Sequence, residues 1–186
     1  MSSSSSSPSS LATVSKPAQS FTPKSSPTPT NLFLVGKAAT HKGAEITINS
    51  ATIEPHVLMN QTRYRPDTPS AVFTPLAPQT GAKFVVLKST VTNNSKVGMD
   101  LTCGYPIKII VVNTKEQEYT PIDDLRNIQG NPVCNDSLQP GFSAEMTWAF
   151  EVPATSEVLA AAFWDVTDLG GYDGDPAIVA FRPSLM

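Results

Sequence analysis

The longest regular pattern of hydrophobic and polar positions in the chain runs from Gly81 to Ser95. Apolar side chains occupy both faces of its first half and one face of its second half, which is typical of a central strand with one end deep in a core. Gly81 precedes the strand, and Asn93-Asn94-Ser95 provides a polar turn after it. We therefore expect the rest of the domain to pack around this strand.

A second amphipathic strand is predicted over residues 144–152, where alternate residues are apolar and Pro153 ends the run. Its apolar face consists of Ala144, Met146, Trp148, Phe150 and Val152. Before it, Pro140 and Gly141 suit the central positions of a type II turn. The alternation over residues 44–53 changes phase near Asn49-Ser50, which indicates a β-bulge.

Shorter apolar or alternating runs predict the remaining strands, at 32–36, 57–60, 106–112, 117–120, 158–164 and 177–181. Residues 65–79, with four prolines, and residues 123–137 are predicted to be loops. Seven or eight strands without helical periodicity predict an all-β protein. An antiparallel immunoglobulin-like β-sandwich over residues 31–186 is the commonest solution, with a jelly roll or small barrel as the alternative.

The first thirty residues have a different composition. Ser, Thr and Pro make up 21 of the 29 residues from Ser2 to Thr30. Such a segment cannot bury enough apolar surface to fold, so residues 1–30 are predicted to be a disordered tether. An expression tag or a tail without function is the alternative.

Charge and hydropathy limit the classes of partner. The net charge is −3 and the sequence pI is about 5.3, so the chain lacks the basic footprint of nucleic-acid-binding proteins. No apolar run is long enough to span a membrane. The polar N-terminus is no signal peptide, which fits either a signal already removed or a cytosolic origin.

Several of these motifs, in this order and spacing, resemble the DUF4352 family of telokin-like, immunoglobulin-like exported domains, which includes the mycobacterial secreted antigen MPT63. The resemblance spans residues 33–182 and is carried by Val35-Gly36, Ile46–Ile48, Gly81–Val86, Thr92–Asn94, Tyr119, Leu138–Gly141 and Phe150–Pro153. It implies export by Gram-positive bacteria or actinobacteria, often as a lipoprotein. The family has no catalytic motif to carry over, so we do not expect an enzyme.

Two further features are interpreted in the light of export. The even cysteine count predicts a Cys103–Cys134 disulfide formed in an oxidising compartment, with two free thiols as the alternative. Met1 precedes a run of serines that looks like the tether of a lipoprotein. Met1 would then stand where a lipidated Cys was removed, and ordinary secretion with a cleaved signal is the alternative.

Candidate catalytic and metal-binding residues are few. His56 and Met59 form an H-x-x-M pair, and Asp123-Asp124 is a carboxylate pair, but we interpret both as surface residues. His41 is the other histidine, and no zinc-ligand spacing accompanies it. An Asp- and Gly-rich stretch offers oxygen ligands for Ca²⁺, although the same residues are normal in a hairpin loop, which we favour. Its carboxylates are Asp165, Asp168, Asp173 and Asp175.

The sequence therefore predicts a monomeric, non-catalytic extracellular or cell-surface domain without a cofactor. Its loops are expected to bind an unidentified protein partner of a host or of the cell envelope. A membrane would be contacted only through a lipid anchor. The alternative is a cell-surface carrier or scavenger of a small ligand or metal ion.

Overall fold

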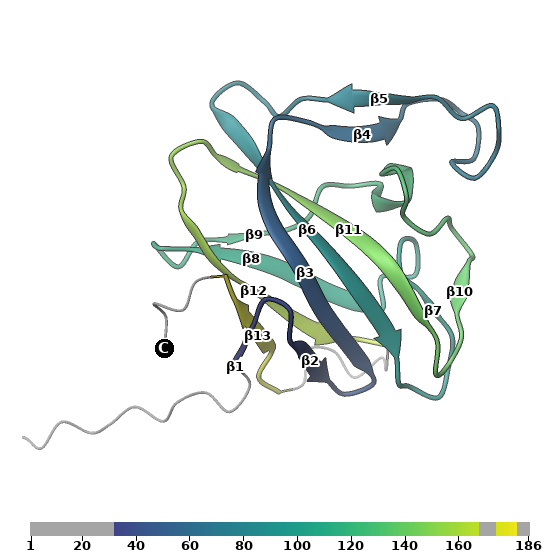
Figure 1. Cartoon of the computed structure of the whole chain (residues 1–186), viewed down its shortest axis with the longest axis vertical. Coiled ribbons are helices and arrows are strands. Elements are labelled where there is room, and N and C mark those ends of the chain that lie inside the picture. Colours follow the sequence, from purple (N-terminus) through teal and green to yellow (C-terminus); the bar gives the residue numbers. More distant parts are fainter. Residues whose placement is uncertain (1–31, 168–173, 182–186) are drawn as a thin grey trace, which may run out of the picture.

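A computed structural model describes residues 32–167 and 174–181 of the chain. In Figure 1 two sheets lie face to face and their strands cross, which confirms the predicted β-sandwich. Among the described residues the helical structure is a single 3₁₀ turn, η1, at Leu125–Asn127. No described helix is long and apolar enough to cross a membrane.

The back sheet of Figure 1 has five strands in the order β1-β13-β12-β8-β9. These strands are β1 (Leu32–Leu34), β13 (Ala177–Ala180), β12 (Val158–Asp165), β8 (Ile107–Asn113) and β9 (Glu118–Tyr119). All neighbours are antiparallel except β1, which pairs with β13 in parallel. This pairing brings residues near the two ends of the chain to one sheet edge.

The front sheet has four antiparallel strands in the order β11-β6-β3-β2. They are β11 (Ser143–Pro153), β6 (Ala82–Asn93), β3 (Ala44–Glu54) and β2 (Ala38–His41). β6 lies between β3 and β11, so the strand that dominates the sequence pattern is central in this sheet. The register between β3 and β6 shifts between Ile48 and Ser50, where the phase change predicted a bulge.

The core lies between the two sheets and follows the predicted apolar face of β11. Met146, Trp148, Phe150 and Val152 are all buried. The indole Nε1 of Trp148 donates to Ser89 Oγ at 2.9 Å, and that hydroxyl donates to the carbonyl of Met146 at 3.1 Å. These two buried polar side chains are thereby paired, as burial requires.

The free edge of β11 is covered by loop segments. Ala149, on the face of β11 opposite the predicted apolar face, is also fully buried. The amide of Ile122 donates to the Ala149 carbonyl at 2.8 Å, and Asn131 pairs with Thr147 two residues away. Covering an edge strand in this way prevents it from pairing with another chain.

Two short ribbons extend from the sandwich. β4 (Val57–Asn60) pairs with β5 (Phe73–Leu76), so the segment predicted as an irregular loop over 65–79 contains a strand. The four prolines of this segment were the reason for that prediction, but an edge strand tolerates one of them, Pro75, because one of its sides needs no amide donor. β7 (Met99–Asp100) pairs with β10 (Ser137–Leu138). After β10, Pro140 and Gly141 form the predicted turn, with Gly141 at φ 82° and the Phe142 amide bonded to the Gln139 carbonyl.

Candidate functional site

Three loop segments come together beside the β4–β5 ribbon and enclose a surface pocket of about 370 Å³. These segments are the loop between β4 and β5, the η1 turn and the segment before β10. We call the three segments together the loop end. The pocket is lined by Thr62, Arg63, Tyr64, Arg65, Pro66, Arg126, Asn127, Val133, Cys134 and Asn135. Pockets of similar volume occur elsewhere on the described surface, so the chemistry of the lining, and not its size, distinguishes this one.

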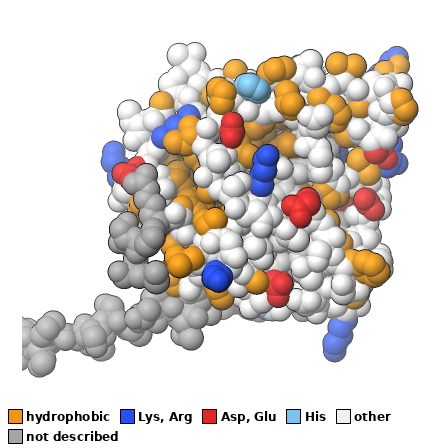
Figure 2. Space-filling view, in the orientation of Figure 1, with side chains coloured by type: hydrophobic (Ala, Val, Ile, Leu, Met, Phe, Trp, Pro, Cys, Tyr) orange, Lys and Arg blue, Asp and Glu red, His pale blue; other side chains and the backbone are white. Residues whose placement is uncertain are grey.

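Arginine is concentrated in this pocket. The whole chain contains four arginines, and Arg63, Arg65 and Arg126 line it; the fourth, Arg182, lies outside the described residues. The guanidinium carbon of Arg63 lies 5.7 Å from the ring centroid of Tyr64, which is half-exposed. In Figure 2 basic and acidic side chains lie next to each other at the edge of the molecule formed by the β4–β5 loop. We call this site the arginine pocket.

Two of these arginines are held by carboxylates of the same loops. Arg65 donates through Nε and Nη2 to the two carboxylate oxygens of Asp67, at 3.1 and 3.0 Å. Arg126 Nη2 lies 2.6 Å from Asp124 Oδ1. These ion pairs are solvent-exposed, so each contributes at most about 1 kcal/mol to stability, but both orient a guanidinium group at the pocket.

The first wall of the pocket is organised by a buried amide. Asn60, at the end of β4, is 3% exposed. Its Oδ1 accepts hydrogen bonds from the amide and hydroxyl of Thr62, at 3.0 and 2.6 Å, and its Nδ2 donates to the carbonyl of Tyr64 at 2.6 Å. The short segment that carries Arg63 is thereby fixed to the end of a strand.

A second buried amide fixes the wall that carries Arg126. Asn131 Nδ2 donates to the carbonyls of Leu125 and Thr147, at 2.9 and 2.8 Å, and Asn131 Oδ1 accepts from the Thr147 amide at 2.7 Å. η1 is therefore attached to β11. The next residues join the β4–β5 ribbon, because the amide of Gln129 donates to the Leu58 carbonyl.

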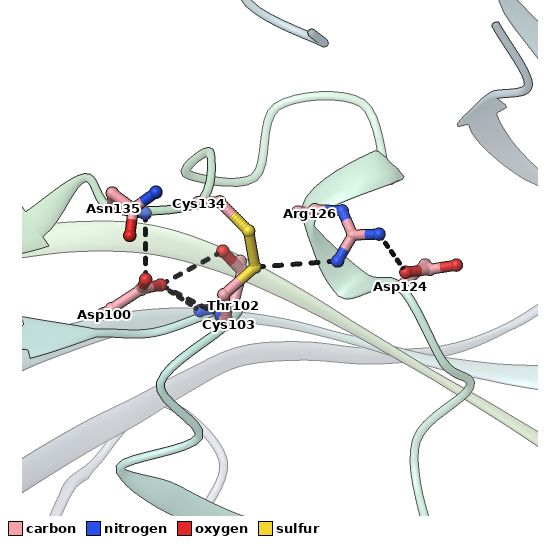
Figure 3. Close-up of a disulfide and its surroundings, with 7 residues drawn as sticks. All are labelled: Asp100, Thr102, Cys103, Asp124, Arg126, Cys134 and Asn135. Atoms are coloured by element: carbon pink, nitrogen blue, oxygen red, sulfur yellow. Dashed lines mark hydrogen bonds and ion pairs between the residues drawn. A yellow bond between two sulfur atoms is a disulfide. The ribbon is translucent and has the colours of Figure 1, made fainter. Parts of the chain in front are cut away.

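The third wall contains the disulfide. Cys103 and Cys134 are joined with a Cα–Cα distance of 5.3 Å, which agrees with the predicted pairing. Figure 3 shows Asp100 on one side of this bond and Arg126 on the other, with Arg126 Nη1 3.7 Å from Cys103 Sγ. Asp100 accepts from the amides of Cys103, at 2.9 Å, and Asn135, at 2.8 Å, so it bridges the two segments that the disulfide joins.

The environment of Asp100 favours its charged form. Burial raises the pKa of the Asp100 carboxyl, but the backbone N–H groups bonded to it, those of Cys103 and Asn135 first, outweigh this effect and hold the pKa below its usual value. A carboxylate with several amide donors is stabilised in this way. Asp100 is therefore ionised at neutral pH and serves as an acceptor for both loop segments.

The resulting pocket is suited to binding an anion. Guanidinium groups present donors in a planar fork that fits carboxylate and phosphate oxygens, and they stay charged at any physiological pH. Two of these groups are held by carboxylates and the segment that carries the third is fixed by Asn60 before a ligand arrives, which lowers the conformational entropy lost on binding. Among the described residues, no group of three or more His, Cys, Asp and Glu side chains could hold a metal ion.

The carboxylates considered for Ca²⁺ do not form a cluster in the part of the chain that the structure describes. Asp165 is buried, and its oxygens accept hydrogen bonds from Gly43 and Thr167, so it connects the ends of two strands. Asp175 is exposed. Asp168 and Asp173, like Met1 and the tether, lie outside the described residues.

The other residues considered in the sequence have structural positions. His41 is buried, and its Nδ1 accepts the amide hydrogen of Asp165 at 2.9 Å. Met59 belongs to the core whereas His56 is exposed, so the two do not form a ligand pair. Asp124, interpreted from the sequence as a surface carboxylate, is half-exposed and is also the ion-pair partner of Arg126.

The arginine pocket was missed in the sequence because its residues lie outside the predicted strands. One signal was available. Arg63 and Arg65 flank Tyr64, and arginine is otherwise rare in a chain whose other basic residues are lysines. The contribution of Arg126, more than sixty residues later, has no sequence signal, since it depends on how η1 is folded onto β11.

Comparison with known proteins shows the fold. No family model matches the chain and no curated protein matches it. An uncharacterized β-sandwich protein of Clostridium difficile 630 is 16% identical, with 86% of this chain and 99% of that one covered and a TM-score of 0.55. The yjhA protein of Bacillus subtilis is 10% identical, with 81% and 99% covered and a TM-score of 0.50. These likenesses support the β-sandwich, while the resemblance to DUF4352 stays a prediction.

Proposed function

We propose that the protein is a non-catalytic, exported domain that binds a protein partner through the loop end, with the arginine pocket at the centre of the contact. One observation carries the proposal. Three of the chain's four arginines and the half-exposed Tyr64 are gathered from separate loops into one pocket. Arginine and tyrosine are enriched at protein interfaces and among the residues that contribute most to binding.

The disulfide supports export. Disulfides persist in oxidising compartments and are rare in the cytosol. The Cys103–Cys134 bond also ties the wall that carries Cys134 to the turn after β7, so the same oxidation that accompanies export would fix this wall of the binding surface. A cell-surface location, with or without a lipid anchor, places these loops where a host or envelope protein could reach them.

Site-specific photo-crosslinking tests the proposal. The full chain would carry a photoreactive phenylalanine analogue in place of Tyr64 and be illuminated on cell envelopes of its source organism. The matched control has the same analogue in place of Lys37, an exposed residue between β1 and β2 at the opposite end of the sandwich in Figure 1. We expect a discrete protein adduct from position 64, weakened by Arg126→Ala, and none from position 37. Equal adducts from both positions would contradict the proposal.

A second function, carriage of a small apolar ligand, is favoured by a different pocket. This pocket of about 290 Å³ is lined mainly by apolar side chains, among them Ile107, Ile122 and the buried Trp148, with the exposed Tyr105 at its rim. Tyr105 has φ 48°, an uncommon conformation for a bulky residue. If the protein carries such a ligand, an apolar ligand should quench the fluorescence of Trp148. This quenching should be lost in the Ile122→Lys variant. A ligand that leaves the fluorescence unchanged would exclude this pocket.

A further inference from the structure

The arginine pocket already binds one class of anion, the carboxylates of its own chain. Arg65 binds both oxygens of Asp67, and Arg126 binds one oxygen of Asp124. The four side chains of these pairs are between 38% and 64% exposed. Because exposed ion pairs are weak, an incoming carboxylate could replace either aspartate at little cost.

We propose that the arginine pocket binds side-chain carboxylates of an acidic segment of a partner protein, and that Asp67 and Asp124 are internal competitors for the same guanidinium groups. The inference rests on the proposed function, because it names the chemical class of the surface that the loop end recognises. It adds a regulatory feature, since the two aspartates set how strongly the pocket attracts that surface.

The charge balance of the pocket favours carboxylates over phosphate. Three guanidinium groups line the pocket and two of them are paired with carboxylates, so among the described residues the Arg63 guanidinium has no carboxylate partner. A carboxylate brings one negative charge, whereas a protein-bound phosphate brings about 1.5 to 2 at neutral pH. The side chains that line the pocket include no lysine. An acidic segment can place single charges at each arginine in turn, with its backbone against the Tyr64 ring.

Two roles for Asp67 and Asp124, competing with the ligand or holding the loops in shape, predict opposite effects of their replacement on ligand binding. If Asp67 and Asp124 only held the loops in shape, their replacement would weaken binding of any ligand. If they compete, replacing either with the uncharged amide frees a guanidinium group and strengthens binding of a carboxylate. Asp124→Asn is well suited, because Asp124 has φ 58° and asparagine tolerates this conformation.

The test is a calorimetric titration of the full, oxidised chain with an oligoglutamate peptide at low salt. Oligoglutamine and a phosphoserine peptide of the same length are the comparison ligands. We expect oligoglutamate to bind in preference to both, with the affinity lowered about tenfold by Arg63→Ala, as for an interface arginine, and lowered also by Arg126→Gln. Asp67→Asn and Asp124→Asn should each raise the affinity about threefold.

The matched control is Lys115→Ala, which removes one positive charge from an exposed turn between β8 and β9. It should change the affinity by less than about twofold. The melting temperature of each variant, measured without reductant, verifies that it is folded. All substituted side chains are exposed or half-buried, so the variants test binding and not folding.

Three results would overturn the inference. An equal loss in Lys115→Ala and Arg63→Ala would show attraction by overall charge alone. Weaker binding in both aspartate variants would assign those residues a structural role. Tighter binding of the phosphoserine peptide, dependent on Arg63, would make the pocket a phosphate site. In each case a crosslink from position 64 would leave the proposed partner-binding function standing, so the two failures can be told apart.

Discussion

The sandwich core and the loop end are held together by different kinds of side chain. In the core, Trp148 and Phe150 are at most 1% exposed and pack among aliphatic residues from both sheets. At the loop end, the residues that organise the structure are the amides Asn60 and Asn131 and the carboxylate Asp100. Apolar packing is non-directional and tolerates small shifts, whereas these polar groups fix particular atoms of particular loops.

This difference predicts that a core substitution unfolds the whole domain, whereas a loop-end substitution mainly affects the pocket. The largest effect is expected from Trp148→Ala. It leaves a cavity in the core and removes the donor to Ser89 Oγ, so we expect a loss of about 3–5 kcal/mol in the free energy of unfolding. Urea denaturation measures this loss.

Phe142→Ala is the control for that experiment, because Phe142 is a large apolar residue that is 66% exposed. It should cost less than about 0.5 kcal/mol. Similar losses in the two variants would mean that burial in the core does not determine stability.

The core residues could be predicted from the sequence because the alternation of apolar and polar side chains is visible among neighbouring positions. Alternation along β11 placed Met146, Trp148, Phe150 and Val152 on one face, and all four are buried. The phase change in β3 located its bulge. Ala149, on the opposite face of the strand, is buried as well, and the alternation along β11 does not indicate this.

The second largest effect is expected at the disulfide. In Cys103→Ser with Cys134→Ser, the free energy of unfolding should fall by about 3.5 kcal/mol, because the unfolded chain gains the entropy of an open loop of 31 residues. We expect hydrogen exchange to accelerate first in the segments around Asp100 and Asn135, with the amides of β6 still protected. In the wild type, neither cysteine should react with an alkylating reagent before reduction. Ready alkylation of both would contradict the bond.

A smaller effect is expected from Asn131→Ala. The substitution leaves the Leu125 carbonyl and the amide and carbonyl of Thr147 without this partner, at a cost of about 1–3 kcal/mol. It should also weaken oligoglutamate binding, because η1 carries Arg126. Asn127→Ala, at the surface of the same pocket, should cost less than about 0.5 kcal/mol. If the two substitutions cost the same, Asn131 would not organise this wall.

The arginine pocket could not be predicted in the same way, because no local pattern records it. Asn60 and Asp100 end short strands and Asn131 lies in a loop, where such residues are ordinary. Nothing in their sequence neighbourhoods shows that Asn131 and Asp100 are bonded to distant residues. Asn131 lies 16 positions from Thr147, and Asp100 lies 35 positions from Asn135. Only the folded sandwich brings these partners together, and with them the three arginines.

The smallest effect is expected from the charge on Asp100, and it depends on pH. The folded-state pKa of Asp100 is lower than its usual value of 3.8, so the folded protein favours the ionised form. The stability that this carboxylate contributes is therefore fully present at neutral pH. It is lost as the pH falls below about 3.8 and through the lower folded-state pKa.

Asp100→Asn keeps the shape and one acceptor but removes the charge. The difference in unfolding free energy between wild type and this variant, measured by urea denaturation from neutral pH down to about pH 3, should favour the wild type and then shrink with acid. A difference that stays constant over this range would show that hydrogen-bond geometry alone, and not the charge of Asp100, holds the two disulfide-linked segments together.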